Sequence, residues 1–212
     1  MHHVMFDIDG TLVQSYKLDE ECYTKSVFEV LGHNIDTDWT KYQHITDSGI
    51  LSQHLKNIGL YKEIDELEQK IKDKFIKKTA NYISKNPVRE ILGASKFIEK
   101  LKNIENVSIS IATGGWFETA SMKLESAGID ISGIPIATSS DHFSRTEIMK
   151  LAMSKAKIAN EHKVSYFGDA KWDQEACDKL GFNFILVGNT IKHSKIINDF
   201  KSVDKAMKFI GL

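Results

Sequence analysis

Two aspartates separated by one residue stand where the first apolar stretch of the chain ends. The stretch begins at Val4, runs through Asp7-Ile8-Asp9 and stops at Gly10, which is typical of a buried strand entering a sharp turn. Alternate residues of a strand point to the same side, so the two carboxylates project together at the carboxyl end of this strand. Adjacent carboxylates repel each other unless a cation or a shared proton lies between them. A simpler interpretation is that the aspartates only help the chain to turn.

Further candidate residues stand where later predicted strands end or where the next helix begins: Thr113, Gly114, Arg145, Asp169 and Asp173. In open parallel sheets, ligands bind at the carboxyl ends of the strands. The sequence therefore predicts that a hydroxyl, a glycine amide, a cation and several carboxylates meet at one edge of a sheet. Taken singly, Thr113 is more simply a helix N-cap, Arg145 a solvated surface residue, and Asp173 a favourable charge at a helix start.

The elements that must position these residues alternate along the second half of the chain. Strands are predicted at residues 107–112, 135–138, 164–167 and 183–187, and helices at 88–102, 116–127, 145–159 and around 176–180. Residues 191–212 are predicted to form a peripheral loop and helix. Short apolar strands that alternate with helices predict a parallel sheet with helices on both faces. We therefore expect an α/β fold with a Rossmann-like core domain made of residues 1–14 and 86–212.

The segment between the two parts of this core contains no strand pattern. Helices are predicted at residues 21–31, 50–58 and 62–84, where apolar residues recur at helical spacing and Gly32, Gly59 and Pro87 give stop signals. An insertion of this size after the first strand predicts a lid over whatever binds there. We expect residues 15–85 to form a small all-helical cap domain.

Composition excludes several classes of protein. The formal net charge is −1 over 212 residues and no basic block is present, so we expect no nucleic-acid partner. No apolar run approaches the ~18 residues of a membrane span, so we expect no membrane partner. Cys22 and Cys177 are too few for a disulfide framework and fit a reducing compartment, which predicts a cytoplasmic location. The oligomeric state stays open.

The motifs together resemble the haloacid dehalogenase-like (HAD) superfamily of phosphatases and phosphotransferases. The family's first motif reads here as Asp7-Ile8-Asp9-Gly10-Thr11, its second as Thr113, and its fourth as Gly168-Asp169-Ala170-Lys171-Trp172-Asp173. The inserted helices are similar to the family's type 1 cap. The third motif normally offers a lysine. Arg145 is the best-placed residue here and Lys150 is its rival, and the usual Lys-Pro pair is missing.

The resemblance implies a Mg²⁺-dependent phosphatase that hydrolyses a small phosphate monoester through an aspartyl-phosphate. Asp7 would be the nucleophile, since an aspartate near its reference pKa of ~3.9 is ionised at neutral pH and needs no base. Asp9 would protonate the leaving alcohol and then activate water. The implied Mg²⁺ ligands are Asp7, Asp169, Asp173 and the backbone carbonyl of Asp9. The implied phosphate-binding groups are Thr113, Gly114 and Arg145.

Other functions remain open from the sequence. A sugar-phosphate mutase similar to β-phosphoglucomutase would keep the same core and return the phosphoryl group to its substrate. A dehalogenase is less consistent with the sequence, because it would not need the acid at Asp9. A phosphonate hydrolase would need a Schiff-base lysine, and no cap lysine is marked as one. A non-catalytic regulator that binds phosphate or metal would not need Asp9 either. The identity of the phosphate ester does not follow from fold resemblance.

Overall fold

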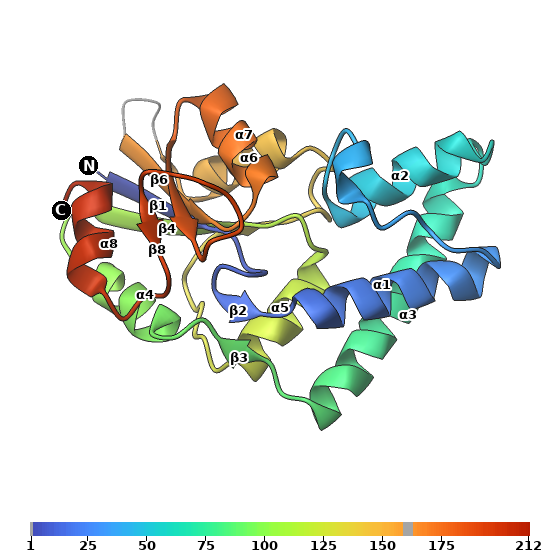
Figure 1. Ribbon diagram of the computed structural model, residues 1–212, viewed down its shortest axis with the longest axis horizontal. Coiled ribbons are helices and arrows are strands. Elements are labelled where there is room, and N and C mark those ends of the chain that lie inside the picture. The colour runs from blue at the N-terminus through green and yellow to red at the C-terminus, as the bar shows by residue number, and fades with distance from the viewer. Residues whose placement is uncertain (1, 159–162) are drawn as a thin grey trace.

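The computed structural model describes residues 2–158 and 163–212, and its largest feature is a parallel sheet (Figure 1). The strands are β1 (His2–Phe6), β4 (Val107–Ala112), β5 (Ile136–Ala137), β6 (Lys163–Gly168), β7 (Asn183–Val187) and β8 (Ile196–Ile197). Their order is β5-β4-β1-β6-β7-β8, and every neighbouring pair is parallel. β1 is therefore flanked by β4 and β6, which brings the carboxyl ends of these three strands together.

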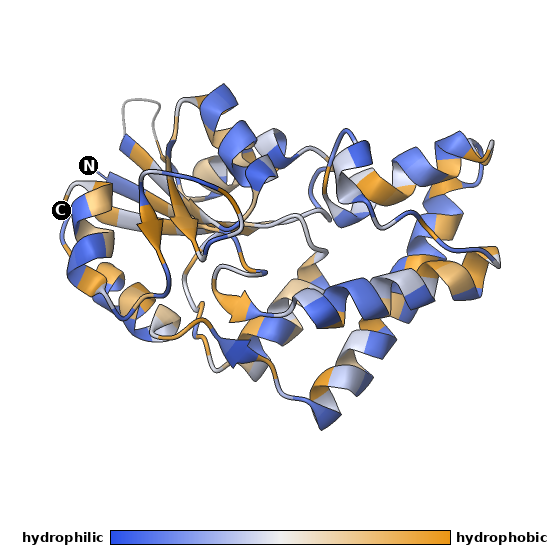
Figure 2. Cartoon of the chain, in the orientation of Figure 1, coloured by the Kyte–Doolittle hydropathy of each residue, from blue (hydrophilic) through white to orange (hydrophobic). Residues whose placement is uncertain are grey.

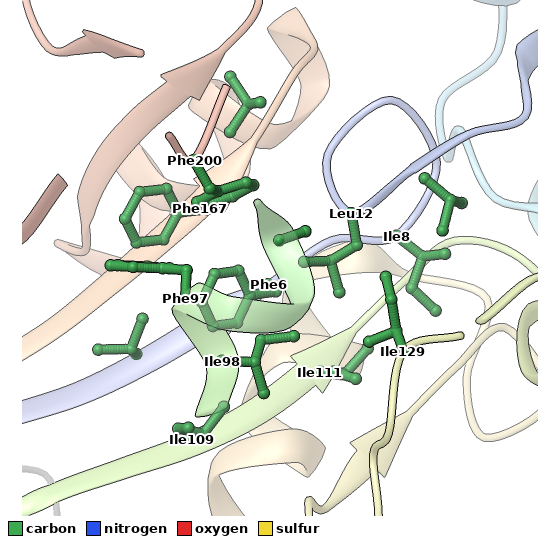
Figure 3. Close-up of a cluster of buried hydrophobic side chains, with 14 of the residues drawn as sticks. Phe6, Ile8, Leu12, Phe97, Ile98, Ile109, Ile111, Ile129, Phe167 and Phe200 are labelled. Atoms are coloured by element: carbon green, nitrogen blue, oxygen red, sulfur yellow. The ribbon is translucent and has the colours of Figure 1, made fainter. Parts of the chain in front are cut away.

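Helices cover both faces of this sheet. They are α4 (Ala94–Lys102), α5 (Phe117–Ser126), α6 (Arg145–Lys155), α7 (Lys171–Leu180) and α8 (Val203–Ile210). Side chains along β1 alternate between two cores. Val4 and Phe6 pack with α4, α5 and α8 in the cluster of Figure 3, whereas Met5 packs with α6 and α7. This arrangement confirms the predicted α/β fold with a Rossmann-like parallel sheet.

The described elements from Tyr16 to Lys85 are all helical and lie together at the right of Figure 1. They are α1 (Tyr16–Leu31), the short 3-10 helix η1 (Trp39–Lys41), α2 (Asp47–Asn57) and α3 (Ile64–Lys85). We call this segment the helical group. The helices carry stripes of apolar and polar residues (Figure 2), and their apolar stripes form a core of their own. Trp116, which precedes α5, is the residue of the sheet domain that joins this core.

Two short strands link the helical group to the sheet domain. Val13–Gln14 (β2) precedes α1, Arg89–Glu90 (β3) follows α3, and the two pair antiparallel. The prediction of a helix from residue 88 is wrong in its first part, because residues 89–90 use their backbone groups in this pairing and α4 begins only at Ala94. Gly93, with φ of 85°, separates the two conformations.

Several other element boundaries also differ from the prediction. α1 begins at Tyr16 rather than at residue 21, and α6 ends at Lys155. The predicted end of that helix, residue 159, lies outside the described residues. Residues 196–197, predicted as loop, form the edge strand β8. Among the described residues, no helix has the length and apolar character needed to span a membrane.

Candidate active site

The two aspartates of the first motif lie just beyond β1. The Asp7 N–H still donates to the carbonyl oxygen of Phe167 at 2.9 Å, which holds this residue in line with the sheet. The chain then turns at Gly10, whose φ is +74°. A Cβ at Gly10 would collide with the Tyr16 hydroxyl, so both the backbone conformation and the close approach require glycine here.

Asp7, Asp169 and Asp173 form a buried cluster of carboxylates. One oxygen from each lies within 4.8 Å of the others. Asp7 Oδ1 and Asp169 Oδ2 are buried without a hydrogen-bond partner among the described residues. Burial and the neighbouring Asp173 carboxylate raise the pKa of Asp7 to about 7, and the same two causes raise the pKa of Asp169 to about 10.

This cluster fits a hard divalent cation. Mg²⁺ is bound in proteins through carboxylate oxygens together with substrate phosphate and water. Uncompensated carboxylate oxygens in a buried position are costly, and a divalent ion removes that cost. The oxygens of Asp7 and Asp169 that lack partners are the donors available for such an ion.

In the third member of the cluster, Asp173, both carboxylate oxygens accept hydrogen bonds from the protein. Its Oδ1 accepts a hydrogen bond of 2.9 Å from Arg145, and its Oδ2 accepts bonds of 3.2 Å from the N–H groups of Asp169 and Ala170. Asp173 therefore holds the turn that carries Asp169 and also orients the guanidinium. It therefore acts at the start of α7 and also lies beside the carboxylates of Asp7 and Asp169.

The candidate phosphate-binding residues lie directly after β4, the parallel neighbour of β1, and at the start of α6. Thr113 is 1% exposed, and it is not the N-cap of α5, because that position belongs to Trp116. A Cβ on Gly114 would lie 2.6 Å from the Arg145 guanidinium, so glycine is needed for this close approach. The Arg145 side chain is only 12% exposed, so it is not a solvated surface residue, and its Nη1 lies 3.6 Å from Asp7 Oδ1. Its rival Lys150 is half-exposed and pairs with Glu147.

These groups share one pocket of about 170 Å³. The structure brings six of the seven predicted site residues to its wall: Asp7, Asp9, Thr113, Gly114, Arg145 and Asp169. The seventh, Asp173, lies behind the wall and contacts Arg145. Lys150 does not line this pocket. The sheet domain also contributes Gly115, Lys123 and Trp172, and the helical group contributes residues of α1, η1 and the segment from Ile45 to Ile50.

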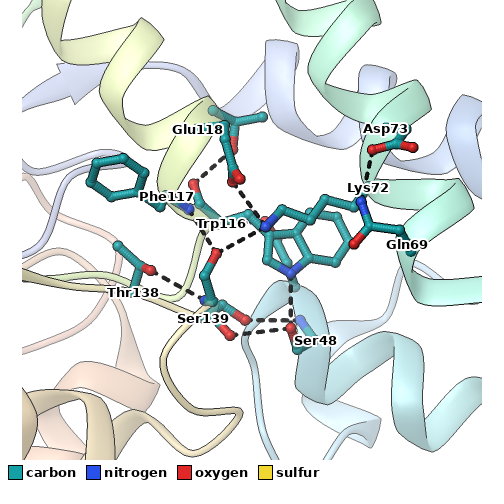
Figure 4. A network of polar contacts seen from close by, with 12 residues as sticks. Ser48, Gln69, Lys72, Asp73, Trp116, Phe117, Glu118, Thr138 and Ser139 are labelled. Atoms are coloured by element: carbon teal, nitrogen blue, oxygen red, sulfur yellow. Dashed lines mark hydrogen bonds and ion pairs between the residues drawn. The ribbon is translucent and has the colours of Figure 1, made fainter. Parts of the chain in front are cut away.

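The helical group is fastened to the sheet domain beside this pocket (Figure 4). Ser48 of α2 accepts a hydrogen bond of 2.8 Å from the Trp116 indole, and its own N–H donates to the Ser139 hydroxyl at 2.9 Å. Lys72 of α3 forms an ion pair of 3.0 Å with Glu118 of α5. These contacts hold the helical group against the sheet domain.

Lys123 of α5 is a site residue that sequence analysis did not identify. Its side chain is 1% exposed, and its ammonium donates to Asp9 Oδ1 at 2.6 Å and to both oxygens of Asp19 at 2.9 Å. The Ser15 hydroxyl also donates to Asp9. Lys123 thus joins the second aspartate of the first motif to the first turn of α1.

This contact decides the charge of Asp9 in the free protein. Burial acts to raise the pKa of Asp9, but the Lys123 ammonium and the hydrogen bonds to the carboxylate outweigh it, so the pKa lies below its usual value. Burial likewise acts to lower the pKa of Lys123, but the carboxylates of Asp19 and Asp9 raise it above that of an ordinary lysine. Asp9 and Lys123 are therefore an ionised pair at neutral pH.

A sequence signal for Lys123 exists. Along α5, the buried positions are Thr119, Ala120, Lys123 and Leu124, which form one helical face. A lysine on such a face is rarely left buried without a partner. A charged residue on the apolar face of the helix after Thr113 therefore marks a contact with an acidic group.

Comparison with known proteins gave a family match. A family model described as haloacid dehalogenase-like hydrolase matches residues 4–187. The comparison with curated proteins found no match.

Solved structures share the fold across nearly the whole chain. β-Phosphoglucomutase from Clostridium difficile has a TM-score of 0.75 at 15% identity, covering 99% of this chain and 97% of that one. CbbY from Rhodobacter sphaeroides in complex with phosphate has a TM-score of 0.74 at 14% identity, covering 96% of each. A hydrolase from Pseudomonas syringae has a TM-score of 0.72 at 21% identity, covering 92% of this chain and 88% of that one. At these identities the likeness shows the fold.

Proposed function

Because the chain belongs to the haloacid dehalogenase-like hydrolase family, we propose that it is a Mg²⁺-dependent phosphatase acting on a small phosphate monoester through phosphorylated Asp7. The observation that carries this proposal is the pair of buried carboxylate oxygens without hydrogen-bond partners, Asp7 Oδ1 and Asp169 Oδ2, in a pocket shared with Arg145 and a second acid, Asp9. A pocket of about 170 Å³ suits a small ester.

Asp7 attacks the phosphorus atom of the ester, and the bond from phosphorus to the alcohol oxygen breaks. The Thr113 hydroxyl, the Gly114 amide and the Arg145 guanidinium hold the non-bridging oxygens, where negative charge is redistributed during transfer. Bound Mg²⁺ would neutralise charge between the phosphate and the carboxylates, and we assign it to Asp7, Asp169 and the backbone carbonyl of Asp9, with Asp173 acting through the turn that it holds.

Asp9 handles the proton. It protonates the leaving alcohol in the first step and takes a proton from the water that attacks phosphorylated Asp7 in the second. The negative charge of a bound phosphate acts to raise the pKa of Asp9, which opposes the effect of Lys123 and favours proton uptake before the first step.

We propose that the helical group is the cap over this chemistry, with domain limits at residues 15–85 for the cap and 1–14 and 86–212 for the core. Its contacts with the loops around Trp116 and Ser139 support this proposal, since they hold the helical group beside the pocket. Exclusion of water then protects the phosphorylated aspartate until the alcohol has left. We expect the protein to act in the cytoplasm on phosphorylated metabolites.

The proposal is tested by measuring phosphate release from a panel of small phosphate esters with and without Mg²⁺. We expect turnover of at least one ester that stops when the metal is chelated and returns when Mg²⁺ is restored. Turnover that is unaffected by chelation would contradict the metal dependence. A hexose phosphate in the panel, with analysis of the sugar product, separates hydrolysis from the transfer expected of a mutase.

The acidic cluster predicts how pH affects stability. Without metal, the pKa values of Asp7 and Asp169 lie at about 7 and about 10, above their ordinary value of 3.8. The folded state then binds more protons than the unfolded state above about pH 4, so the metal-free protein loses stability as pH rises from about 4 to 7 and beyond. Mg²⁺ relieves this repulsion, so we expect it to raise the melting temperature more at about pH 8 than at about pH 5.

Differential scanning fluorimetry with and without Mg²⁺ checks this prediction. Asp169→Asn is the matched variant: it removes one buried charge, so its metal-free form should be less sensitive to pH and its response to Mg²⁺ should be smaller. An equal Mg²⁺ response at both pH values in the unmodified protein would refute the assignment of the ion to this cluster.

A further inference from the structure

The wall that the helical group contributes to the pocket carries acidic side chains and no basic ones among the described residues. Among the described lining residues, this wall contains Asp19, Glu20 and Asp47, and no lysine, arginine or histidine. The rest of this wall is largely aromatic or aliphatic: Tyr16, Tyr23, Trp39, Ile45 and Ile50. The part of the ester beyond the phosphate must meet this wall when the pocket is covered.

The two cations that line the pocket, Lys123 and Arg145, both come from the sheet domain. Each of them already forms ion pairs with carboxylates of the protein. Lys123 is paired with Asp9 and Asp19. Arg145 is paired with Asp173 and donates to the carbonyl oxygen of Ile45. Among the described lining residues, no cation is left to receive a second anionic group of the substrate.

Two hydrogen bonds hold Asp47 in place near Asp9, the residue that we propose protonates the leaving alcohol. Its Oδ2 accepts the Trp116 N–H at 2.9 Å, and its own N–H donates to the carbonyl oxygen of Gly114 at 2.8 Å. A Cβ placed on Gly115 would lie 3.7 Å from Asp9 Oδ2 and 3.8 Å from Asp47 Oδ2. The Asp9 and Asp47 carboxylates therefore both lie close to Gly115 in the wall of the pocket.

The Trp116 N–H donates to Oδ2 of Asp47, so the other carboxylate oxygen, Oδ1, can accept a hydrogen bond from a ligand in the pocket. Burial raises the pKa of Asp47 to about 7, so the carboxylate is only partly ionised at neutral pH when it stands alone. A cation held against it would lower that pKa. Tyr23 and Trp39, which also line the pocket, pack edge to face and offer aromatic surface of the kind that favours cationic groups.

We propose that the preferred substrate is the phosphate ester of an amino alcohol, whose ammonium group is received by Asp47 and the aromatic wall of the helical group. This inference rests on the proposed phosphatase function and names the substrate class for it. An ester with a second anionic group is disfavoured because it would meet Asp47 and Glu20 without a free cation.

Three esters that share a two-carbon alcohol test the proposal: 2-aminoethyl phosphate, 2-hydroxyethyl phosphate and phosphoglycolate. They carry an ammonium, a hydroxyl and a carboxylate at the same distance from the phosphate. At about pH 8 with Mg²⁺, we expect kcat/KM to fall in that order, by about tenfold or more between the ammonium and the carboxylate ester. An equal or higher kcat/KM for the hydroxyl or carboxylate ester would overturn the proposal.

Asp47→Asn isolates the charge. The amide oxygen can still accept the Trp116 N–H, so the local fold should persist, and the ratio of kcat/KM between the ammonium and hydroxyl esters should fall toward one. Asp73→Asn is the matched control, because it removes an exposed charge from α3 outside the pocket and should leave the ratio as it is. An unchanged ratio in Asp47→Asn would overturn the role of Asp47.

The failure of the inference is distinguishable from failure of the proposed function. If folded protein with Mg²⁺ releases phosphate from no ester of the series or of the wider panel, the phosphatase assignment itself fails, and the inference fails with it. If esters are hydrolysed but those with neutral or anionic alcohols are preferred, the phosphatase assignment stands and only the amino-alcohol inference is overturned.

Discussion

Replacing Asp7 with Asn is expected to lower kcat for phosphate release by a factor on the order of 10⁴ or more. The neutral amide has nearly the same shape as the carboxylate but cannot attack phosphorus as a nucleophile. It also weakens the metal site, because Asp7 Oδ1 is one of the buried oxygens available to the ion. Steady-state phosphate release with the best ester of the panel measures this loss.

Stability measurements separate this effect from unfolding. Asp7 is buried beside Asp169 and Asp173, and its ionisation is opposed by burial and by the Asp173 carboxylate, which raise its pKa. Removing its charge should therefore leave the metal-free melting temperature unchanged or raise it at neutral pH. A folded Asp7→Asn protein that retains most of the activity would contradict the assignment of Asp7 as nucleophile.

Replacing Lys123 with Met is expected to destabilise the protein and to damage proton transfer. The ammonium is buried between Asp9 and Asp19, so its loss leaves two carboxylates without their partner, at a cost of about 3–5 kcal/mol. The Asp9 carboxylate also loses the group that fixes its position. For an alkyl ester, whose leaving alcohol needs a proton, kcat/KM should fall by about 10²-fold.

Comparison with an aryl ester separates a role in proton transfer from a purely structural role. A purely structural role would lower kcat/KM equally for the aryl and the alkyl ester. Its phenolate leaves without a proton, so kcat/KM for p-nitrophenyl phosphate should fall much less than for the alkyl ester. Lys123→Arg should recover part of both stability and activity, since it restores the charge. If Lys123→Met misfolds, the double variant with Asp19→Asn, which removes one uncompensated carboxylate, allows the same comparison. Equal losses for the two esters would contradict a positioning role.

The sequence was sufficient to predict the positions of those site residues that follow a regular strand pattern. Asp7, Thr113 and Asp169 each follow an apolar strand, and parallel strands end at a common edge, so local periodicity predicts that they lie close together. The structure has these strands adjacent in the order β4-β1-β6. The family match over residues 4–187 agrees with the motifs from which the resemblance was inferred.

Contacts that depend on three-dimensional packing were beyond this kind of prediction. Lys123 and Asp19 are 104 residues apart in the chain, and no local pattern pairs them. The strand β8 has two residues and forms only because β7 offers an open edge. The start of α4 was misplaced because the pairing of β2 with β3 outweighs the helical pattern after Pro87. In each case tertiary contacts override local propensity.

The most direct test of the central claim is to look for the phosphoryl group on Asp7 itself. The protein is mixed with Mg²⁺ and a hydrolysed ester, quenched in acid during turnover, digested, and analysed by mass spectrometry. The account predicts one added phosphoryl group on the peptide that contains Asp7, absent without substrate and absent in Asp7→Asn. A phosphoryl group on another residue during turnover would contradict it. Samples quenched rapidly throughout turnover in which Asp7 is never modified would also contradict it.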